Sequence, residues 1–304
     1  SPEAAGSLVA MAFNERGEII ASRAGGPLVR VRDENGDGAP EAVAVYCEKV
    51  TNCQGIMPLN GHVFAVGDGP DGTGFYRISD EDSDGVGEAV TTLFKFKGNM
   101  GEHGPHAPLL GPDGMIYLMI GNHSSTELPF EPTSPHHHYY EGDLLTPKYE
   151  DAGGHAVGIQ APCGTIVRTN LQGEFVELVA GGMRNAYDMV FNKQGDLFTW
   201  DSDMEWDEGL PWFRPTRVLQ LIPGGEYGSR SGWSVWPDYY IDGLPPLSNT
   251  GRGSPTGVEC YNHHMYPARY HNALFLCDWS LGRIVVARME PAGGTYTARN
   301  ELFL

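Results

Sequence analysis

The sequence contains two short stretches whose residue types could bind a ligand and move a proton. In "GEHGPHAPLLGPDG", His103 and His106 stand just before an apolar run, where a histidine could act as a general base near neutral pH. In "GGMRNAYDMVFNKQG", Arg184 and Asn185 hold the matching place, and together they could donate several hydrogen bonds to a planar, oxygen-rich ligand. The alternatives are ordinary surface-loop histidines and an arginine paired with a structural carboxylate.

A third stretch, "TWDSDMEWDEGLPWFRP", is rich in acids that alternate along the chain. If the segment is extended, alternate side chains share one face. Four carboxylates on one face repel one another unless a cation lies between them, and the alternative is a solvated edge. The four acids are Asp201, Asp203, Glu205 and Asp207. We therefore expect a metal ion near Asp201 and Asp203.

Histidines dispersed along the first half of the chain suggest a second kind of metal site. Imidazoles and carboxylates suit Zn²⁺, Mn²⁺ or Fe²⁺ and could activate a water molecule. This hypothesis takes its ligands from the acids near Asp203 and from His103, His106, His123 and His155. It predicts a bound transition metal, and the alternative is that the histidines lie on separate loops.

An acidic turn of the form D-x-[ND]-x-D-G-x-x-E-A occurs twice. The first copy holds Asp33, Asn35, Asp37 and Glu41, and the second holds Asp80, Asp82, Asp84 and Glu88. Each copy has oxygen-bearing side chains at the first, third and fifth positions and then a glycine, as in a calcium-binding EF-hand loop. The final glutamate of that loop is missing from both copies. The two turns could be structural Ca²⁺ sites or solvated hairpin turns.

Around these residues the sequence repeats a hairpin pattern: an apolar strand, a few turn residues with a glycine, and a second apolar strand. The turn glycines are Gly17, Gly61, Gly114 and Gly195, and a looser unit lies near residue 270. The first two intervals, 44 and 53 residues, are close to the roughly 40–50 residues of one four-stranded β-propeller blade. The sequence therefore predicts an all-β protein, a single β-propeller domain over residues 1–304 with five blades evident.

Two long segments, about 122–162 and about 202–256, interrupt the repeat. Long ordered loops on a propeller usually build a binding face, so we expect these insertions to do so. The chain stops after an outer-strand pattern at Phe303–Leu304. We expect a sixth blade to be lost, cleaved or supplied by another chain, which would leave the ring open between its first and last blades.

Composition disfavours several classes of partner. Lys and Arg total 20 against 39 Asp and Glu, a formal net charge of −19, which disfavours nucleic acid and anionic membranes. No stretch approaches the roughly 18 apolar residues of a membrane span. This composition suits a periplasmic or secreted protein with neutral substrates or bound cations. Cys47 with Cys53, and Cys260 with Cys277, could then form disulfides.

The stretches "HGPHAPLLGPDGMIYLMIG" and "GMRNAYDMVFNKQGDLF" also carry a resemblance. Together they resemble the soluble quinoprotein glucose and sorbosone dehydrogenase family, and more closely the planctomycete-type "membrane-bound dehydrogenase" propellers of that superfamily. The resemblance implies a six-bladed propeller of the quinoprotein dehydrogenase type that holds pyrroloquinoline quinone (PQQ) and Ca²⁺ and oxidises a sugar hydroxyl. It also implies that His103 takes the hydroxyl proton, that Arg184 polarises the quinone oxygen, that Asn185 and Arg283 hold the cofactor, and that a cytochrome c accepts the electrons.

Two other functions remain open beside PQQ-dependent oxidation of a small carbohydrate. One is a metal-dependent lyase or hydrolase that acts on carbohydrate. The other is a non-catalytic propeller that binds a glycan or a protein partner, in which tryptophans stack on sugar rings or merely fill the core between blades. Those tryptophans are Trp200, Trp206, Trp212, Trp233 and Trp236.

Overall fold

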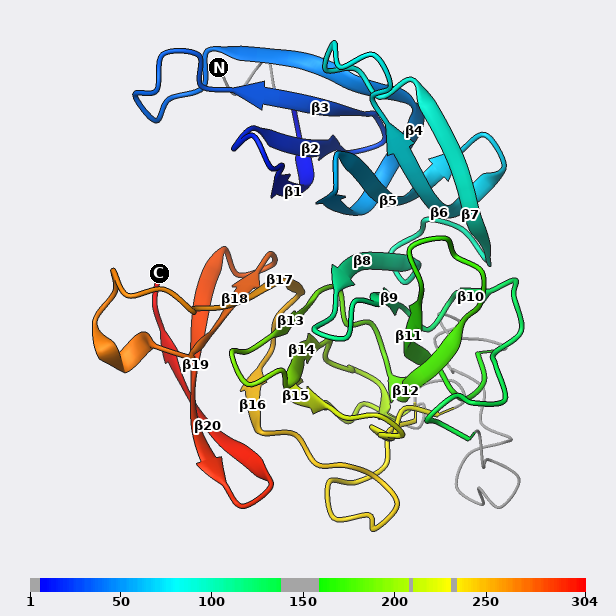
Figure 1. Ribbon diagram of the computed structural model, residues 1–304. Coiled ribbons are helices and arrows are strands. Elements are labelled where there is room, and N and C mark those ends of the chain that lie inside the picture. The colour runs from blue at the N-terminus through cyan, green and yellow to red at the C-terminus, as the bar shows by residue number, and fades with distance from the viewer. Residues whose placement is uncertain (1–5, 138–158, 208–209, 231–233) are drawn as a thin grey trace.

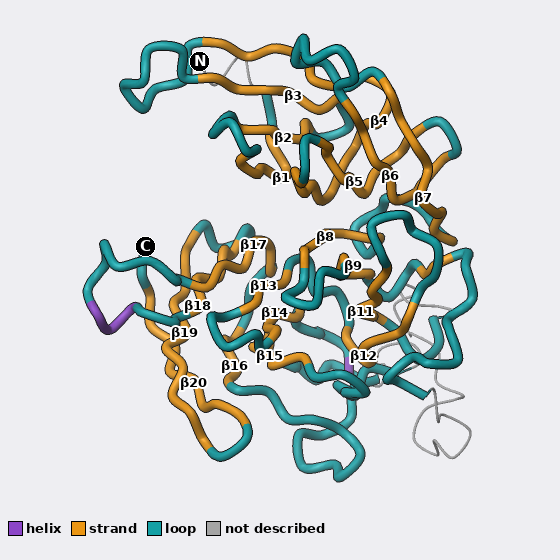
Figure 2. The backbone as a smooth tube through the Cα atoms, viewed as in Figure 1, coloured by secondary structure: helices purple, strands orange, loops and turns teal. Residues whose placement is uncertain are grey.

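The computed structural model describes residues 6–137, 159–207, 210–230 and 234–304. Within these residues the regular structure is almost entirely β, in strands β1 to β20, with a short 3₁₀ helix, η2 (Ala268–Tyr270). Figure 2 shows strands joined by loops throughout, including a long loop that precedes β16 and extends away from the sheets. The predicted all-β class is confirmed.

The strands form one eight-stranded antiparallel sheet and three four-stranded ones. Because β4 pairs with β3 along its first part and with β5 along its last part, the eight-stranded sheet comprises two blades, and we number the five blades 1 to 5 in chain order. Blade 1 contains β1 (Leu8–Phe13), β2 (Ile19–Arg23), β3 (Pro27–Arg32) and the first part of β4 (Ala42–Leu59). Blade 2 contains the last part of β4, β5 (His62–Gly69), β6 (Gly72–Ser79) and β7 (Ala89–Lys97), with β10 (Ser125–Thr126) at its edge.

Blade 3 contains β8 (Pro105–Leu110), β9 (Ile116–Ile120), β11 (Gly164–Thr169) and β12 (Glu177–Met183). Blade 4 contains β13 (Met189–Phe191), β14 (Leu197–Asp201), β15 (Thr216–Leu221) and β16 (Ser248–Gly251), and blade 5 contains β17 (Pro255–Cys260), β18 (Leu274–Asp278), β19 (Arg283–Ala292) and β20 (Thr295–Leu302).

The repeated hairpin motif forms the first two strands of each blade. Gly17, Gly61, Gly114 and Gly195 all have φ between +75° and +88°, a backbone conformation that glycine adopts without steric cost. In blade 5 the same turn uses Asn272, with φ of +59°. The periodic glycines therefore predicted the hairpins correctly, because the turn between the two strands requires positive φ.

An apolar cluster fills each interface between successive blades. Phe64, Phe75 and Phe94 of blade 2, for example, pack in one cluster with Ile116 and Leu118 of blade 3. Equivalent clusters join blades 1 and 2, 3 and 4, and 4 and 5. Burial of these side chains at about 25 cal/mol per Å² of apolar surface is the main favourable contribution to folding.

The blades are arranged as an open ring. In Figure 1 blade 1 (blue) and blade 5 (orange and red) lie on either side of the opening, and among the described residues no strand of one pairs with a strand of the other. The expected opening between the first and last blades is therefore present. The expectation about a sixth blade stays a prediction.

Because successive strands are antiparallel, the connections between them alternate between two faces of the ring. One face, which we call the connection face, carries the segments that lead from one blade into the next and the turns between the second and third strands of each blade. The opposite face, the turn face, carries the glycine turns between the first and second strands of the blades. It also carries both acidic turns, because these follow β3 and β6, the third strands of blades 1 and 2.

The structure differs from the sequence-based expectations in two details. The predicted insertion 202–256 contains β15 and β16, so only the loops around these strands are insertions; the polar sequence of β16 hides it from an apolar pattern. Neither of the two disulfides that the sequence allowed is formed, since all five cysteines are free thiols. The described residues form no helix with the length and apolar character that crossing a membrane requires.

Gly55 permits the contact between blades 2 and 3. A Cβ atom at this position would lie 2.6 Å from Ala107 Cα and 2.7 Å from the His106 carbonyl oxygen. We predict that Gly55→Ala lowers the free energy of unfolding by about 1–3 kcal/mol, because the backbone of β8 must move. Gly294→Ala, at a glycine with no atom within 4 Å of the added Cβ, is the control. Equal midpoints of urea denaturation for the two variants would contradict this assignment.

Candidate functional site

A cavity of about 720 Å³, which we call the main cavity, lies on the connection face. Its lining comes from the segments that enter blades 2 to 5 and from the turns that follow β14 and β18. The side chains used below are Gln54, Glu102, His103, Arg184, Asn185, Tyr187, Asp203, Glu205, Trp206 and Trp279. Two of the sequence motifs, from different blades, therefore meet in one cavity.

His103 lies in the β7–β8 connection and is only 2% exposed. Its Nδ1 is 2.5 Å from Asn122 Oδ1, so Nδ1 carries the proton and donates to the amide oxygen. In this tautomer Nε2 is the acceptor nitrogen, which is the state a general base requires. The ring also packs against that of His123, with 4.5 Å between centroids.

Asp201 fixes the backbone of Arg184 and Asn185. This carboxylate, at the end of β14, has no solvent exposure. It accepts hydrogen bonds from the backbone N–H of Asn185 at 2.9 Å, of Arg184 at 3.1 Å and of Ser202 at 3.0 Å. Its charge is balanced by Arg217, whose Nη2 lies 2.8 Å from Asp201 Oδ2. The path of the chain through residues 184 and 185 is therefore set by one buried ion.

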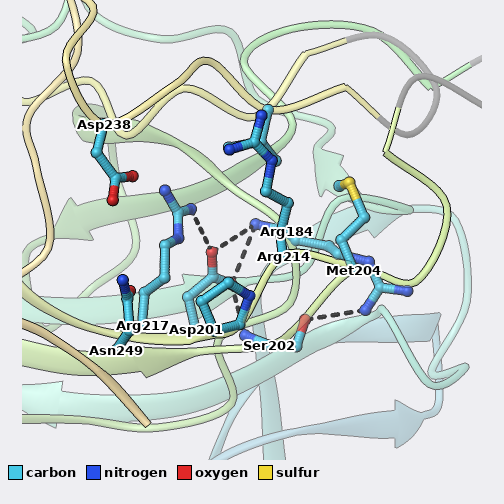
Figure 3. Close-up of a pocket in the computed structure, with 10 residues that line it drawn as sticks. Arg184, Asp201, Ser202, Met204, Arg214, Arg217, Asp238 and Asn249 are labelled. Carbon is cyan, nitrogen blue, oxygen red and sulfur yellow. Dashed lines mark hydrogen bonds and ion pairs between the residues drawn. The ribbon is translucent and has the colours of Figure 1, made fainter. Parts of the chain in front are cut away.

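The side chain of Arg184 extends from this fixed backbone to Ser202 Oγ, 3.0 Å from Nη1. Figure 3 shows Arg184, Asp201, Ser202 and Arg217 together on the wall of a smaller cavity of about 40 Å³. Arg184 and Ser202 line both this cavity and the main cavity. The guanidinium is thus held in place by the chain and stands at the boundary of the main cavity.

The side chain of Asn185 joins blade 4 to blade 3. Its Oδ1 accepts from His106 Nε2 at 2.9 Å, and its Nδ2 donates to the Glu102 carbonyl at 3.1 Å. The His106 ring also packs at a tilt against that of Tyr187, with 4.5 Å between ring centroids. Burial lowers the pKa of His106 to about 4, against a smaller upward effect of the bond to Asn185. His106 is therefore a neutral hydrogen-bond donor at neutral pH.

A family model described as Domain of unknown function (DUF7133) matches residues 9–208, more than half of the chain. The chain belongs to this family. Comparison of the DUF7133 chain with curated protein sequences gives no match.

Solved structures match the DUF7133 chain over nearly its whole length. PQQ-bound aldose sugar dehydrogenase from Streptomyces coelicolor has a TM-score of 0.65 at 16% identity, covering 98% of this chain and 81% of that chain. The apo form of soluble aldose sugar dehydrogenase from Escherichia coli has a TM-score of 0.64 at 16% identity, covering 99% and 87%. A calcium structure of carbohydrate-active enzyme family AA12 from Trichoderma reesei has a TM-score of 0.63 at 13% identity, covering 98% of this chain and 83% of that chain. These similarities confirm the quinoprotein-dehydrogenase type of β-propeller that the resemblance implied.

The four acids at the end of β14 and just after it do not share one face, contrary to expectation. Asp201 bonds to Arg217 as described, and Asp207, also buried, bonds to Arg214 at 2.7 Å. Asp203 and Glu205 alone line the main cavity. Burial raises the pKa of Asp203, and the negative charge of Glu205 raises it further. A cation could therefore bind at Asp203 and Glu205. The carboxylate oxygens of Asp201, by contrast, already accept hydrogen bonds from protein donors.

The two acidic turns fold alike on the turn face. In each turn three carboxylates place an oxygen within 4.8 Å of one another: Asp33, Asp37 and Glu41 in the first, and Asp80, Asp82 and Glu88 in the second. Asn35 donates to Glu41 at 2.6 Å, and Asp84 accepts from the backbone N–H of Val86 at 2.7 Å. Calcium at these turns stays a prediction, and such sites would lie on the face opposite the main cavity.

The proposed transition-metal site gains no support from the described residues. Within them, the groups of three close metal-ligating side chains are the two acidic turns. His106 Nε2 is hydrogen-bonded to Asn185, and the exposed ring of His123 packs at a tilt against that of His103. His155 lies outside the described residues. In the part of the chain that the structure describes, His106 and His123 therefore take part in hydrogen bonding and ring packing.

Other expected binding residues lie elsewhere. Arg283 is not in the lining of the main cavity, because its guanidinium bonds to Asp278 Oδ2 at 2.9 Å and to the Arg252 carbonyl at 2.9 Å. Trp200 and Trp236 are buried and Trp212 is exposed away from the cavity lining. Trp206 lines the cavity, and Trp233 lies outside the described residues.

Sequence reasoning missed Asn122, Gln54, Tyr187 and Trp279. Asn122 follows β9 and Trp279 follows β18, so both hold the position just after the second strand of a blade. Asp203 lies at the corresponding place after β14. A comparison of second-strand ends, rather than of first-strand beginnings, would therefore have found Asn122 and Trp279, but not Gln54, within β4, or Tyr187, before β13.

We predict that Asp201→Asn destabilises the DUF7133 chain by about 3–5 kcal/mol, because the buried charge of Arg217 loses its partner. Asp203→Asn is the matched control, since this half-buried carboxyl makes no ion pair within the described residues, and its effect should stay below about 1 kcal/mol. The free energies of unfolding in urea test this. Similar losses in both variants would show that Asp201 is not the structural ion.

A second prediction concerns acid stability. An unfolded histidine titrates near pH 6.5, whereas folded His106 titrates near pH 4, so the unfolded chain binds more protons between these values. The folded state should lose up to about 3 kcal/mol as pH falls from about 6.5 to 4. His106→Gln should remove this contribution and flatten the pH dependence of unfolding. His263→Gln, at an exposed histidine, is the control; parallel curves for His106→Gln and the unmodified chain would contradict the prediction.

Proposed function

We propose that this protein is a PQQ- and Ca²⁺-dependent dehydrogenase that oxidises a hydroxyl of a neutral sugar in the main cavity. One observation carries the proposal: His103 from the connection into blade 3, and Arg184 and Asn185 from the connection into blade 4, line the same cavity. The likeness of the fold to a PQQ-bound aldose sugar dehydrogenase supports it.

The lining fits PQQ if a divalent cation binds with it. Arg184 and Asn185 offer donors to a planar, oxygen-rich group. PQQ is a tricarboxylate, however, and the described lining has one guanidinium, that of Arg184, beside the carboxylates of Glu102, Asp203 and Glu205. A Ca²⁺ ion held by carboxylate oxygens of Asp203 and Glu205 would offset this repulsion. PQQ affinity should therefore depend strongly on Ca²⁺.

When bound, PQQ supplies the two-electron acceptor that side chains lack. His103 Nε2 would take the proton of the substrate hydroxyl while the carbon-bound hydrogen leaves as hydride, so that the alcohol carbon becomes a carbonyl. Asn122 holds the proton on Nδ1 and thereby keeps Nε2 as the base. Arg184 would stabilise the negative charge that develops on an acceptor oxygen, and its fixed backbone means that little reorganisation is needed.

The resemblance further suggests a cytochrome c as electron acceptor and a periplasmic or secreted location, and we include both in the proposal. Calcium at the acidic turns would have a separate, structural role, because those turns lie on the opposite face. Two classes of calcium site are thus proposed, one at the cofactor and one distant from it.

The proposal is tested by titrating the purified chain with PQQ, with and without Ca²⁺, and by assaying dye reduction with a panel of aldoses. We expect PQQ to bind only with Ca²⁺. His103→Gln should keep binding but lose about 100-fold or more in kcat, because the general base is gone. Arg184→Lys should weaken PQQ binding about tenfold, since lysine lacks the planar fork.

A matched pair of variants separates the two classes of calcium site. Asp203→Asn with Glu205→Gln should abolish the Ca²⁺ dependence of PQQ binding. Asp37→Asn with Asp84→Asn, in the acidic turns, should leave PQQ binding unchanged. If the unmodified chain with Ca²⁺ gives no absorbance change on PQQ addition, the proposed function is wrong.

A further inference from the structure

Two tryptophans at the mouth of the main cavity are left unexplained by the oxidation chemistry. Trp279, in the β18–β19 turn, is 78% exposed, and Trp206, in the β14–β15 loop, is 46% exposed. Both line the cavity. Large aromatic side chains left in water beside a cavity usually mark a surface that binds a ligand.

The turn that presents Trp279 is held rigidly from below. Asp278 is 3% exposed and accepts from Arg283 Nε at 2.9 Å and from the Ser254 N–H at 3.0 Å. The Trp279 N–H in turn donates to the Ser254 carbonyl at 3.0 Å. A buried ion thus supports an exposed indole on a fixed backbone, so little backbone entropy is lost when a ligand stacks on it.

The depth of the cavity separates this indole from the candidate base. His103 is 2% exposed, at the buried end, whereas Trp279 is 78% exposed, at the mouth. They also come from different blades, 3 and 5. A molecule that presents a hydroxyl to His103 and also covers Trp279 must therefore extend from the floor of the cavity to its rim.

The indole faces and the charge of the chain limit which class of ligand can bind at the mouth of the main cavity. Flat indole faces stack on the C–H faces of pyranose rings. The formal net charge of −19 on the whole chain disfavours acidic sugars. The remaining class is a neutral carbohydrate with more than one ring.

We infer that Trp279 and Trp206 form an outer sugar subsite, so that the preferred substrate is a neutral oligosaccharide whose terminal ring reaches His103 while the next ring stacks on the indoles. This inference rests on the proposed function for the reaction, but the binding that it predicts does not require PQQ. Arg283 then acts as a positioning residue for Trp279 through Asp278, rather than as a residue that holds the cofactor.

The subsite is tested with glucose, maltose, maltotriose, cellobiose and cellotriose as probes. For the chain loaded with PQQ and Ca²⁺, we expect the KM of the better disaccharide, maltose or cellobiose, to be about tenfold or more below that of glucose. Trp279→Ala should raise the KM of that disaccharide about tenfold, with the KM of glucose and kcat within about twofold. Trp279→Phe should recover part of the loss, because a smaller aromatic face remains.

Trp212→Ala is the matched control, because Trp212 is 54% exposed but lies outside the cavity lining, and it should leave every KM unchanged. Binding of the same sugars to the PQQ-free chain, measured by calorimetry, separates the two proposals. Oligosaccharide binding that depends on Trp279 in a chain that fails to bind PQQ supports the subsite and overturns only the oxidation chemistry.

Two outcomes would overturn the subsite while leaving the proposed oxidation intact. One is equal KM for glucose and every oligosaccharide in the unmodified enzyme. The other is a Trp279→Ala variant whose sugar KM values do not change but whose electron transfer to a cytochrome c slows, which would make the indole a contact for the protein acceptor.

Discussion

The buried charge of Asp201 is the constraint on which the candidate site depends. A carboxylate without solvent exposure is tolerated only where donors surround it. Here the donors are Arg217 and the backbone N–H groups of Arg184, Asn185 and Ser202. Because these donors come from separate segments, the chain between blades 3 and 4 has to follow one path. That path carries the Arg184 guanidinium to the wall of the main cavity.

The same segment joins blade 4 to its neighbours. Asn185 bonds to His106 of blade 3, the Tyr187 hydroxyl lies 3.1 Å from the Gln54 carbonyl at the entry to blade 2, and Asp188 accepts from the Val258 N–H of blade 5 at 3.1 Å. Burial raises the pKa of Asp188 to about 6, which reflects the cost of placing an acid between blades. The site is thus organised by contacts across the ring rather than by local sequence alone.

This distinction explains what the sequence could and could not predict. Turn glycines such as Gly17 and Gly114 report a local backbone requirement, so the hairpins, the blades and the positions of His103 and Arg184 could be predicted. Spacing cannot tell whether an acid faces a cation or a protein donor, because the partner comes from elsewhere in the chain. Asp201 was therefore assigned to a metal, and Arg283 to a cofactor by resemblance, although Arg217 and Asp278 are their partners.

Strand β4 has a consequence of a different kind. Its first part pairs with β3 and its last part pairs with β5, so blades 1 and 2 share one continuous strand, whereas later blades are joined by loops. Loss of β4 would remove a strand from two blades at once. Blades 1 and 2 should therefore open together as one cooperative unit in native-state hydrogen exchange, with similar protection on β2 and β6, while blades 3, 4 and 5 can open one at a time.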